Sequence, residues 1–379
     1  MPTGPLEIGE IPQSRSGEMN HFFDLPFQLY AQDRYFVPRL RLELKDLFSP
    51  KNPFFLDAEI KIWLAKDNDK IVGRIVGIIN HAHNRFHNER CAFFGFFEAI
   101  DDLRVAQALL QKVEDYAKQQ GMEILRGPTN FSTNHDCGLL IEGFNDPPQI
   151  MMPYNPPYYQ KLLEDCGLKK AIDLLALRLP TNLKLPERIA KIVERTEKSK
   201  AITYRPINKK KWNQEMAAMF EIYNDAWEKN WGFVPFTWEE FKHVGDSLKM
   251  VVKEELVVFV EVAGEPAAFA VTLPDYNQVF KKITNGRLFP TGFYHLLRAD
   301  HTINRLRVIT LGIRKKFGHL GLGGLMYNYL VNTSHRMGYI DAELSWILET
   351  NTSMINPMKL MGAELIKKYR LFEKRLDLQ

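Results

Sequence analysis

The sequence predicts an α/β fold of the α+β kind, with a mixed sheet, built as two lobes of one plan. Three observations carry this prediction. The chain has 379 residues, which is more than a single hydrophobic core usually serves. A strand rich in β-branched and apolar residues, a glycine-rich turn and an amphipathic helix follow one another between Arg305 and Gly338. The same order of elements occurs once in each half of the chain.

The composition restricts the classes of function. With 50 basic and 46 acidic residues the net charge is +4, which is too balanced to predict a nucleic-acid partner. The apolar run Cys91–Ile100 is too short to span a bilayer, and no secretory signal is expected. Together with Cys137 and Cys166, Cys91 forms no metal-binding spacing. We therefore predict a cytoplasmic protein with reduced thiols, no metal and no membrane span.

The first half reads as an alternation of strands and helices. Ile60–Asn80 surrounds an Asp-Asn-Asp turn and predicts a hairpin. The strand Cys91–Ala99 follows, and then an amphipathic helix with Asp101 as its expected N-cap. A strand at Met122–Asn130, a short helix and a final strand at Ala171–Pro180 complete the half.

The second half repeats this order. Val257–Leu273 predicts a hairpin, Arg305–Ile313 a strand, and Ala342–Asn351 the strand after the long helix. Pro357–Leu376 supplies the short helix and the last strand. An ancient duplication explains the match. The predicted organisation is lobe one at 1–184, a charged connecting helix at 185–200 and lobe two at 201–379.

The two lobes differ in the length of chain between the strand after the long helix and the end of the short helix. Asn351 lies 11 residues before Gly362, whereas Asn130 lies 37 residues before Gly167. Lobe one therefore carries about 26 additional residues, at 131–156, and this length is outside the usual range of loops. Its prolines and glycines predict an ordered loop that packs over another part of the protein, as a lid does.

The glycines of lobe two lie in a strand-to-helix turn. Free N–H groups and the positive end of a helix dipole favour a phosphate at such a turn. A P-loop is excluded because no Lys-Ser/Thr pair follows Gly323. A dinucleotide turn fits Gly321 and Gly323 but has Met326 at its third position. The alternative is a tight turn that only allows close helix packing.

A family resemblance extends this interpretation. The run Gly318-His319-Leu320-Gly321-Leu322-Gly323 resembles the Arg/Gln-x-x-Gly-x-Gly/Ala turn of the GNAT superfamily, the acyl-CoA-dependent N-acyltransferases, with Gly318 in place of Arg or Gln. Asn351 and Gly362 match the spacing of a later family motif, in which Met358 replaces the usual Tyr. Nearly the whole chain resembles two-lobed GNAT-like bacterial proteins. Lobe one has no glycine at the corresponding turn.

The resemblance implies that coenzyme A or acyl-CoA is the co-substrate, with its pyrophosphate held by backbone N–H groups. The residues that it implies for this site are Leu311, Gly312, Ile313, Gly318, His319, Leu320, Gly321, Leu322, Gly323 and Asn351. Arg314, Lys315 and Lys316 either add positive charge to this site or form a solvated basic turn.

Catalytic candidates come from the strand after the long helix. Because a strand alternates its faces, Glu343, Ser345 and Glu349 share one side. Polar groups are unusual on a central strand, so they either line the reaction cleft or form structural pairs with Arg305 or Arg307. Met358 removes the family's usual general acid.

The acceptor site is predicted from aromatic residues. Trp227, Trp231 and Phe233 precede the hairpin of lobe two, where the resemblance implies an acceptor pocket, and Tyr154 of the insertion is added to them. An apolar acceptor or a long acyl chain suits such a pocket. His81, His83 and His87 are interpreted as histidines of a polar surface loop rather than as metal ligands.

Three functions remain open on the sequence alone. The first is transfer of an acyl group from acyl-CoA to a small-molecule or lipid-like amine. The second is a non-catalytic tandem module that binds acyl-CoA or a partner, which the altered Gly318 and Met358 positions favour. The third is a transferase that uses aminoacyl-tRNA, which the balanced charge disfavours.

Overall fold

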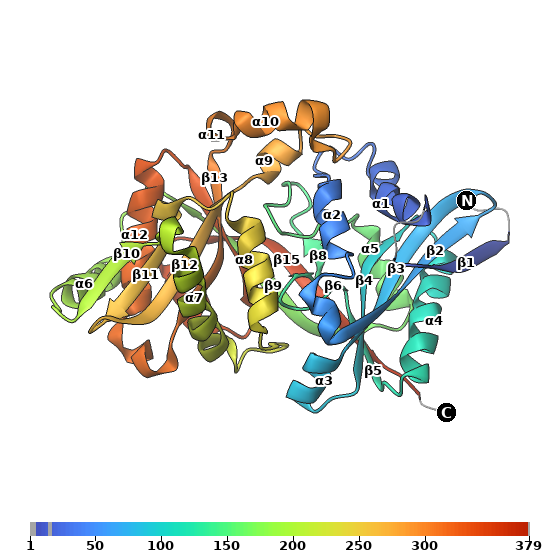
Figure 1. Cartoon of the computed structure of the whole chain (residues 1–379), viewed down its shortest axis with the longest axis horizontal. Coiled ribbons are helices and arrows are strands. Elements are labelled where there is room, and N and C mark those ends of the chain that lie inside the picture. Colours follow the sequence, from blue (N-terminus) through green and yellow to red (C-terminus); the bar gives the residue numbers. More distant parts are fainter. Residues whose placement is uncertain (1–4, 14–16, 378–379) are drawn as a thin grey trace. The chain divides into compact units, whose positions relative to one another are not determined.

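The computed structural model describes residues 5–13 and 17–377, and these form two compact units (Figure 1). Unit 1 comprises Met1–Leu174, Asn277–Arg298 and Lys367–Gln379, and unit 2 comprises Leu175–Tyr276 and Ala299–Ile366. The units therefore differ from the continuous lobes predicted at 1–184 and 201–379. The outermost parts of both predicted lobes, 1–4 and 378–379, and the short stretch 14–16 lie outside the described residues.

Unit 1 is a mixed sheet with helices packed on it. The strands that pair in order are β1 (Leu6–Ile11), β2 (Ala58–Asp67), β3 (Lys70–Asn80), β4 (Cys91–Ala99), β5 (Ile124–Gly127) and β15 (Glu364–Arg375). Neighbours are antiparallel except β4 and β5. The shorter strands are β6 (Thr129–Asn130), β7 (Asp136–Cys137) and β8 (Leu139–Glu142), of which β8 pairs with β15. The helices are α1 (Gly17–Leu29), α2 (Arg41–Leu47), η1 (Pro53–Leu56), α3 (His81–His87), α4 (Leu103–Gln119), α5 (Tyr158–Asp165), α9 (Asn277–Phe280), η4 (Leu288–Gly292) and α10 (Phe293–Leu297).

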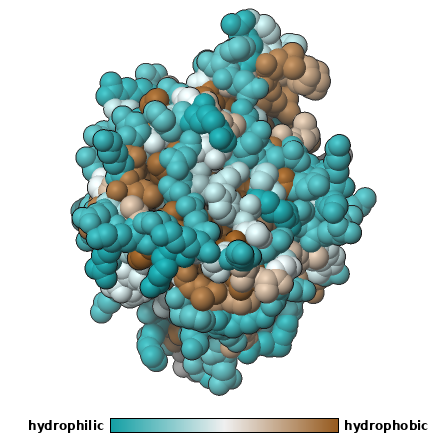
Figure 2. Space-filling model, turned by 90° about the vertical axis from the view of Figure 1, so that its left-hand side faces the viewer, coloured by the Kyte–Doolittle hydropathy of each residue, from teal (hydrophilic) through white to brown (hydrophobic). Residues whose placement is uncertain are grey.

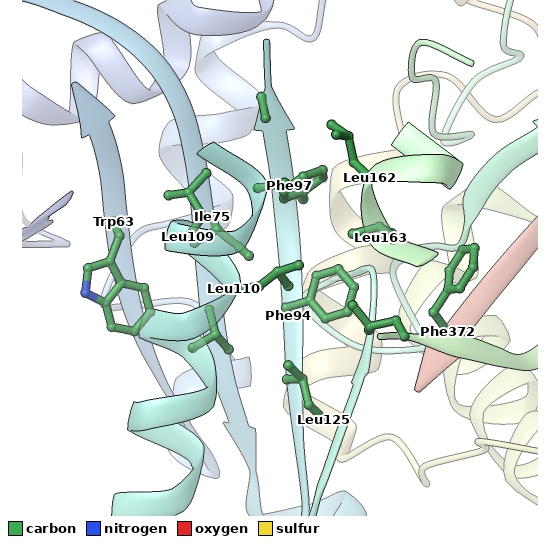
Figure 3. Packing of buried hydrophobic residues seen from close by; sticks show 14 of the residues in the cluster. Trp63, Ile75, Phe94, Phe97, Leu109, Leu110, Leu125, Leu162, Leu163 and Phe372 are labelled. Carbon is green, nitrogen blue, oxygen red and sulfur yellow. The ribbon is translucent and has the colours of Figure 1, made fainter. Parts of the chain in front are cut away.

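The main core of unit 1 forms because α4 is amphipathic. Its buried side chains include Val105, Leu109 and Val113, which recur at helical spacing and face the sheet. Asp102, one residue after the predicted cap, accepts a hydrogen bond from the Arg104 N–H and begins the helix. Figure 3 shows this cluster, in which α4, α5 and the strands each contribute apolar side chains.

Unit 2 repeats the plan of unit 1. Its strands pair in the order β10 (Ile202–Pro206), β11 (Val257–Val262), β12 (Glu265–Pro274), β13 (Arg305–Ile313), β14 (Asp341–Leu348) and β9 (Lys169–Pro180). β13 and β14 pair in parallel, whereas the neighbouring strands from β10 to β13 pair antiparallel. The helices are α6 (Glu187–Glu197), η2 (Lys209–Lys211), α7 (Trp212–Trp227), α8 (Trp238–Leu248), η3 (Glu254–Leu256), α11 (Ala299–Thr302), η5 (Lys315–Leu320), α12 (Leu322–Arg336) and α13 (Thr352–Leu360).

Each half of the chain gives its last strand to the other unit. The second half of β9, Leu175–Pro180, belongs to unit 2, where β9 lies beside β14. Conversely, β15 enters unit 1 from Lys367 onward and pairs with β5, from Phe372–Gly127 to Arg375–Ile124. This exchange is why the compact units are not continuous in sequence, and a repeated order of elements does not reveal it.

The structure bears on three local predictions and corrects one of them. The stretch 81–87 is the helix α3 rather than a polar loop, because Asn80 caps it through the His83 N–H. Part of the insertion 131–156 forms β7 and β8, and β8 joins the sheet of unit 1 through β15. The connecting helix is present as α6 and packs on α12 within unit 2.

Candidate active site

The two central parallel strands of unit 2 pair over only part of their length. Their register runs from Arg305–Asp341 to Val308–Leu344. Both strands continue beyond this ladder, β13 to Ile313 and β14 to Leu348. A register shift between β12 and β13 occurs at the same level. The facing edges of β13 and β14 beyond the ladder therefore have backbone groups that this pairing does not use.

Unpartnered polar side chains gather at the level where that ladder ends. Among the described residues, Thr272 Oγ1, Thr310 Oγ1 and Trp346 Nε1 are buried without a hydrogen-bond partner. Thr272 is the register partner of Val308, while Thr310 and Trp346 lie two residues beyond Val308 and Leu344. Buried polar groups in native proteins are normally satisfied. Three such atoms therefore occur on the adjacent strands β12, β13 and β14 near the end of the ladder.

The glycine turn lies at the end of β13. Residues Lys315–Leu320 form the 3-10 helix η5, and Gly321 follows with φ of +75° as the N-cap of α12. A 3-10 helix uses N–H groups in its own i to i−3 bonds. The first turn of α12, by contrast, offers free N–H groups and the positive end of the helix dipole.

Open space lies on one side of this turn. A Cβ at Gly318 would meet no atom within 4 Å, whereas a Cβ at Gly321 would lie 2.7 Å from Ile192 Cγ2. Ile192 belongs to α6, whose Thr196 Oγ1 also donates to the Leu320 carbonyl at 3.3 Å. Helix packing therefore requires glycine at Gly321, as the alternative interpretation expects, but packing does not require glycine at Gly318.

The basic residues after β13 are engaged in ion pairs. Arg314 pairs with Glu221 and Glu265, and Lys316 also pairs with Glu265. Lys315 contacts Glu228. These ion pairs already compensate the three positive charges. The side chains nevertheless lie at the edge of the glycine turn.

Glu343 and Ser345 come together inside unit 2. Ser345 Oγ donates to Glu343 Oε1 at 2.9 Å, and Arg307 Nε donates to Ser345 Oγ at 3.1 Å. Arg307 is the register partner of Glu343 and its guanidinium lies 5.2 Å from the Trp346 ring centroid. Glu343 is 0% exposed and Arg307 2% exposed. Ser345 thus connects Glu343 with Arg307, while Arg305 pairs with Asp341.

The remaining sequence-predicted residues follow β14 or precede β11. Glu349 lies in the turn after β14, and Asn351 caps α13 by accepting from the Met354 N–H at 3.2 Å. Met358, at the family's tyrosine position, is fully buried in the apolar core of unit 2. Its place in the core explains why the position holds no polar side chain.

The aromatic candidates divide between the units. Trp227 of α7 covers Gly312, where an added Cβ would lie 2.3 Å from the indole, and it stacks on Tyr223 at 4.6 Å between ring centroids. Phe233 is buried in unit 2, and Trp231 is half-buried there. Tyr154 belongs to unit 1, where its hydroxyl donates to Asp33 Oδ2 at 2.7 Å. Burial and this hydrogen bond raise the pKa of Tyr154 well above its ordinary value.

The corresponding strands of unit 1 are closed against each other. Their parallel ladder ends at Phe93–Arg126, but β6 then runs beside β4, and Phe96 N–H donates to Asn130 Oδ1 at 2.7 Å. A Cβ at Gly95 would lie 1.7 Å from the Thr129 carbonyl oxygen. The chain itself therefore occupies the place that stays unpaired in unit 2.

Sequence reasoning missed a buried carboxylate in unit 1. Glu98 Oε2 accepts from the hydroxyls of Tyr30 and Tyr159, both at 2.7 Å, and Glu98 Oε1 lies 3.4 Å from Arg74 Nη2. Burial raises the pKa of the Glu98 carboxyl, and Arg74 opposes this shift. A lone glutamate within the apolar run of β4 was the available signal.

A second polar group in unit 1 combines metal-binding residue types. Ligand atoms of His83, Glu89 and Cys91 all lie within 4.8 Å of one another. Glu89 is also paired with Arg126 at 3.1 Å, and burial lowers the pKa of His83 to about 4. Burial raises the pKa of the Cys91 thiol to about 12. The guanidinium of Arg126 therefore already pairs with the carboxylate of this group.

Comparison with known proteins identifies relatives along the whole chain. A family model described as Acetyltransferase (GNAT) family matches residues 25–135. Protein YghO of Escherichia coli (strain K12) is 37% identical over 366 residues, which cover 95% of this chain and 93% of YghO. The protein named bacterial ceramide synthase of Caulobacter vibrioides is 33% identical over 378 residues, 98% of both chains.

Solved structures share the fold at much lower identity. A tandem GNAT protein from the clavulanic acid biosynthesis pathway superposes with a TM-score of 0.60 at 9% identity and covers 98% of this chain and 99% of its own. A GCN5-related N-acetyltransferase from Sphaerobacter thermophilus gives 0.53 at 11% identity, covering 99% and 97%. The match to the GNAT family model, with relatives that align along nearly the whole chain and solved structures that share its tandem fold, shows that the chain belongs to the GNAT superfamily as a two-lobed member.

Proposed function

We propose that the chain is an N-acyltransferase that moves an acyl group from acyl-CoA to the amine of a lipid-like acceptor. The observation that supports this most is the end of the β13–β14 ladder after Val308 and Leu344. It is bordered by the unpartnered polar atoms of Thr310 and Trp346. A thioester carbonyl oxygen can accept from a threonine hydroxyl and an indole N–H, so an acyl-CoA fits the groups present.

The residues that would hold acyl-CoA follow from the same elements. The first turn of α12 would take the pyrophosphate, since a helix N-terminus favours an anion. Gly318 leaves open space beside it, and Leu311–Ile313 would offer the edge of β13 beyond the ladder. Acyl-CoA supplies an activated acyl carbon and a thiolate as the leaving group.

The proton of the amine needs an acceptor inside unit 2. We assign this role to Ser345 and Glu343, because the serine hydroxyl already donates to the carboxylate. In the transfer, the acceptor nitrogen bonds to the acyl carbon, the carbon–sulfur bond breaks, and the nitrogen's proton passes through Ser345 to Glu343. Met358 has no proton to give to the thiolate, so the thiolate would leave without a general acid. Glu349, in the turn after β14, is kept as a second candidate acceptor.

The name of the Caulobacter relative suggests the acceptor class. A ceramide is the amide of a fatty acid and a long-chain amino alcohol, so the matching acceptor here would be a long-chain amine. The aromatic side chains Trp227, Trp231 and Phe233 suit such an apolar acceptor. Tyr154 is the least supported of the four predicted acceptor-binding residues, because it belongs to unit 1 and its hydroxyl donates to Asp33 there.

Hydrogen exchange tests where acyl-CoA binds. We expect a long-chain acyl-CoA to protect the amides of residues 311–326, at the end of β13, the turn and the start of α12. Free CoA lacks the acyl chain. It should therefore protect the turn but should protect the amides of β14 less than the long-chain acyl-CoA does. Protection confined to β4 and α4 would overturn the assignment of the cofactor to unit 2.

Product formation tests the reaction itself. The full chain, a long-chain acyl-CoA and a long-chain amino alcohol should release free thiol and give a product with the mass of the amide. Binding of acyl-CoA without thiol release over a panel of amines would instead favour the non-catalytic module, which the core position of Met358 supports.

A further inference from the structure

Large apolar side chains are exposed along the segment Asn277–Arg298 of unit 1. Phe289 is 75% exposed, Leu297 70%, Tyr294 57% and Phe293 47%. A single exposed apolar residue is ordinary, but four within nine residues form a patch that monomeric proteins seldom expose. Hydrophobic colour gathers on the projection at the top of Figure 2, the end of the molecule where Figure 1 places α10.

The segment is anchored to the rest of unit 1 by a buried side chain and a backbone hydrogen bond. Ile283 is buried, and the Arg41 N–H donates to the Gly286 carbonyl at 2.9 Å. The rings of Phe289 and Phe293 stack at 5.8 Å between centroids with an interplanar angle of 6°. The apolar side chains are therefore displayed on a supported surface and are not the consequence of a loose loop.

The charged side chains within the segment have one sign. Residues 277–298 include no Asp or Glu and contain four Lys and Arg residues. All four are exposed, and they are Lys281, Lys282, Arg287 and Arg298. Arg298 lies over the Tyr294 ring at 5.7 Å, so positive charge and aromatic surface are adjacent. The segment therefore has a local charge of +4, equal to the net charge of the whole chain.

This combination selects among the surfaces that could cover the patch. A second copy of the same segment would bring eight positive charges together without a compensating carboxylate from either segment. A bilayer with anionic lipids meets both requirements, because aromatic rings partition to the head-group level and basic side chains are attracted to the negative surface. Among the described residues no helix is long and apolar enough to cross a membrane, so contact would be at the surface.

We propose that the segment Asn277–Arg298 docks the protein on an anionic lipid bilayer. Phe289, Phe293 and Leu297 enter the head-group region, and the basic side chains contact the lipid phosphates. This inference goes beyond acyl transfer and does not depend on it. If both hold, the surface brings the enzyme to the phase in which a lipid-like amine resides.

Vesicle co-sedimentation of the full chain tests the proposal. The protein should bind vesicles of phosphatidylcholine with phosphatidylglycerol, and bind less to phosphatidylcholine alone or at high salt. The double variant Phe289→Ser/Leu297→Ser should weaken binding about tenfold or more, since each side chain contributes buried apolar area. Lys281→Glu/Lys282→Glu should weaken binding to the anionic vesicles only. Leu56→Ser, at another exposed leucine of unit 1, is the matched control and should bind like the wild type.

Two results would overturn the inference. One is equal binding of the wild type and the Phe289→Ser/Leu297→Ser variant to anionic vesicles. The other is a dimer in sedimentation velocity that this variant abolishes, which would identify the patch as an interface between copies. Thiol release with a short, water-soluble amine is measured in parallel. If acyl transfer is correct, that activity persists in the variants, so the two proposals can fail separately.

Discussion

Arg307 illustrates how single residues constrain this protein. It is among the largest fully buried side chains, and removing a guanidinium from water is costly unless its donors and charge are satisfied. Ser345 and the cation–π contact with Trp346 provide part of that compensation, and Glu343 lies opposite in register. The same carboxylate is the proposed proton acceptor, so stability and catalysis depend on one group.

Replacing Glu343 separates these two roles. Glu343→Gln keeps the volume but leaves the charge of Arg307 without its register partner, so we expect a lower melting temperature and a loss of about 3–5 kcal/mol. If Glu343 accepts the amine's proton, turnover per folded molecule should also fall about 10²–10⁴-fold. Acyl-CoA affinity should stay close to that of the wild type. Calorimetry and thiol release well below the variant's melting temperature measure both effects.

Asp341→Asn is the matched control for this experiment. Asp341 is a buried carboxylate two residues earlier on β14 and pairs with Arg305 at 3.3 Å. Its substitution should lower stability without changing turnover per folded molecule. A Glu343→Gln protein with wild-type turnover at low temperature would make Glu343 a structural residue.

His83 predicts a pH dependence of stability. Burial, with His87 nearby, lowers its pKa from 6.5 to about 4. Above pH 6.5 the imidazole is neutral in both states and the full stability is present. As the pH falls from 6.5 towards 4, the unfolded state binds a proton that the folded state does not, so the free energy of unfolding decreases by up to about 3 kcal/mol.

A His83→Phe variant tests this assignment by chemical denaturation between pH 7.5 and 4. The aromatic replacement can use the existing edge contact with Phe93. The difference in stability between wild type and variant should change across this window in the direction given above. A constant difference over the whole window would mean that His83 does not titrate as proposed.

At the level of elements, the N-terminus of α12 combines an observed packing contact with a proposed anion site. Its glycines allow α6 to pack closely, as Ile192 does against Gly321, and its first turn is the proposed anion site. Gly318, in η5 before this helix, has no packing neighbour within 4 Å of an added Cβ, so packing does not require glycine there. Substitutions can therefore distinguish them.

Gly318→Val should reduce CoA affinity by about tenfold or more while the melting temperature stays near that of the wild type, because the added side chain occupies the space beside α12 without a clash. Gly321→Val is less informative, since its φ of +75° and the Ile192 contact would strain the fold. Isothermal calorimetry measures the affinity. Gly9→Val, also without neighbours, serves as control. If the wild type, Gly318→Val and Gly9→Val bind CoA with equal affinity, the turn is not part of the cofactor site.

At the level of the whole molecule, the exchange of β9 and β15 ties each unit to the distant half of the chain. Phe372 of β15 is fully buried in the same cluster as Phe94 and Leu163 of unit 1 (Figure 3). Leu177 of β9 is buried in the core of unit 2. Each core is therefore completed by a side chain from the other half of the sequence.

Reciprocal core variants test this exchange. Phe372→Ala should destabilise unit 1 by about 3–5 kcal/mol, and Leu177→Ala should destabilise unit 2 by about 2–5 kcal/mol. In native-state hydrogen exchange, Phe372→Ala should lower protection in β4 and α4 first, and Leu177→Ala in β13 and α12. Loss of protection confined to the neighbouring residues in sequence, at 357–376 or 169–184, would contradict the exchange.

The sequence by itself determined the order of elements and the fold class. Period-2 and period-3.6 patterns located β13, α12 and β14 because burial of one face leaves a direct record in the residue types. The repeat and the glycine turn led to the GNAT superfamily, which the relatives confirm. The pairing of Glu343 with Ser345 was also accessible, since residues two apart on a strand share a face.

Only the tertiary structure decided which strands complete which unit and which groups are satisfied. The exchange of β9 and β15 is a choice between equivalent partners far apart in sequence, and local patterns do not encode it. The pairing of Arg314 with Glu221 and Glu265, like the enclosure of Glu98 by Tyr30 and Tyr159, joins residues from distant elements. Such contacts depend on three-dimensional proximity, and for the same reason the exposed face of Asn277–Arg298 became visible only once the chain was folded.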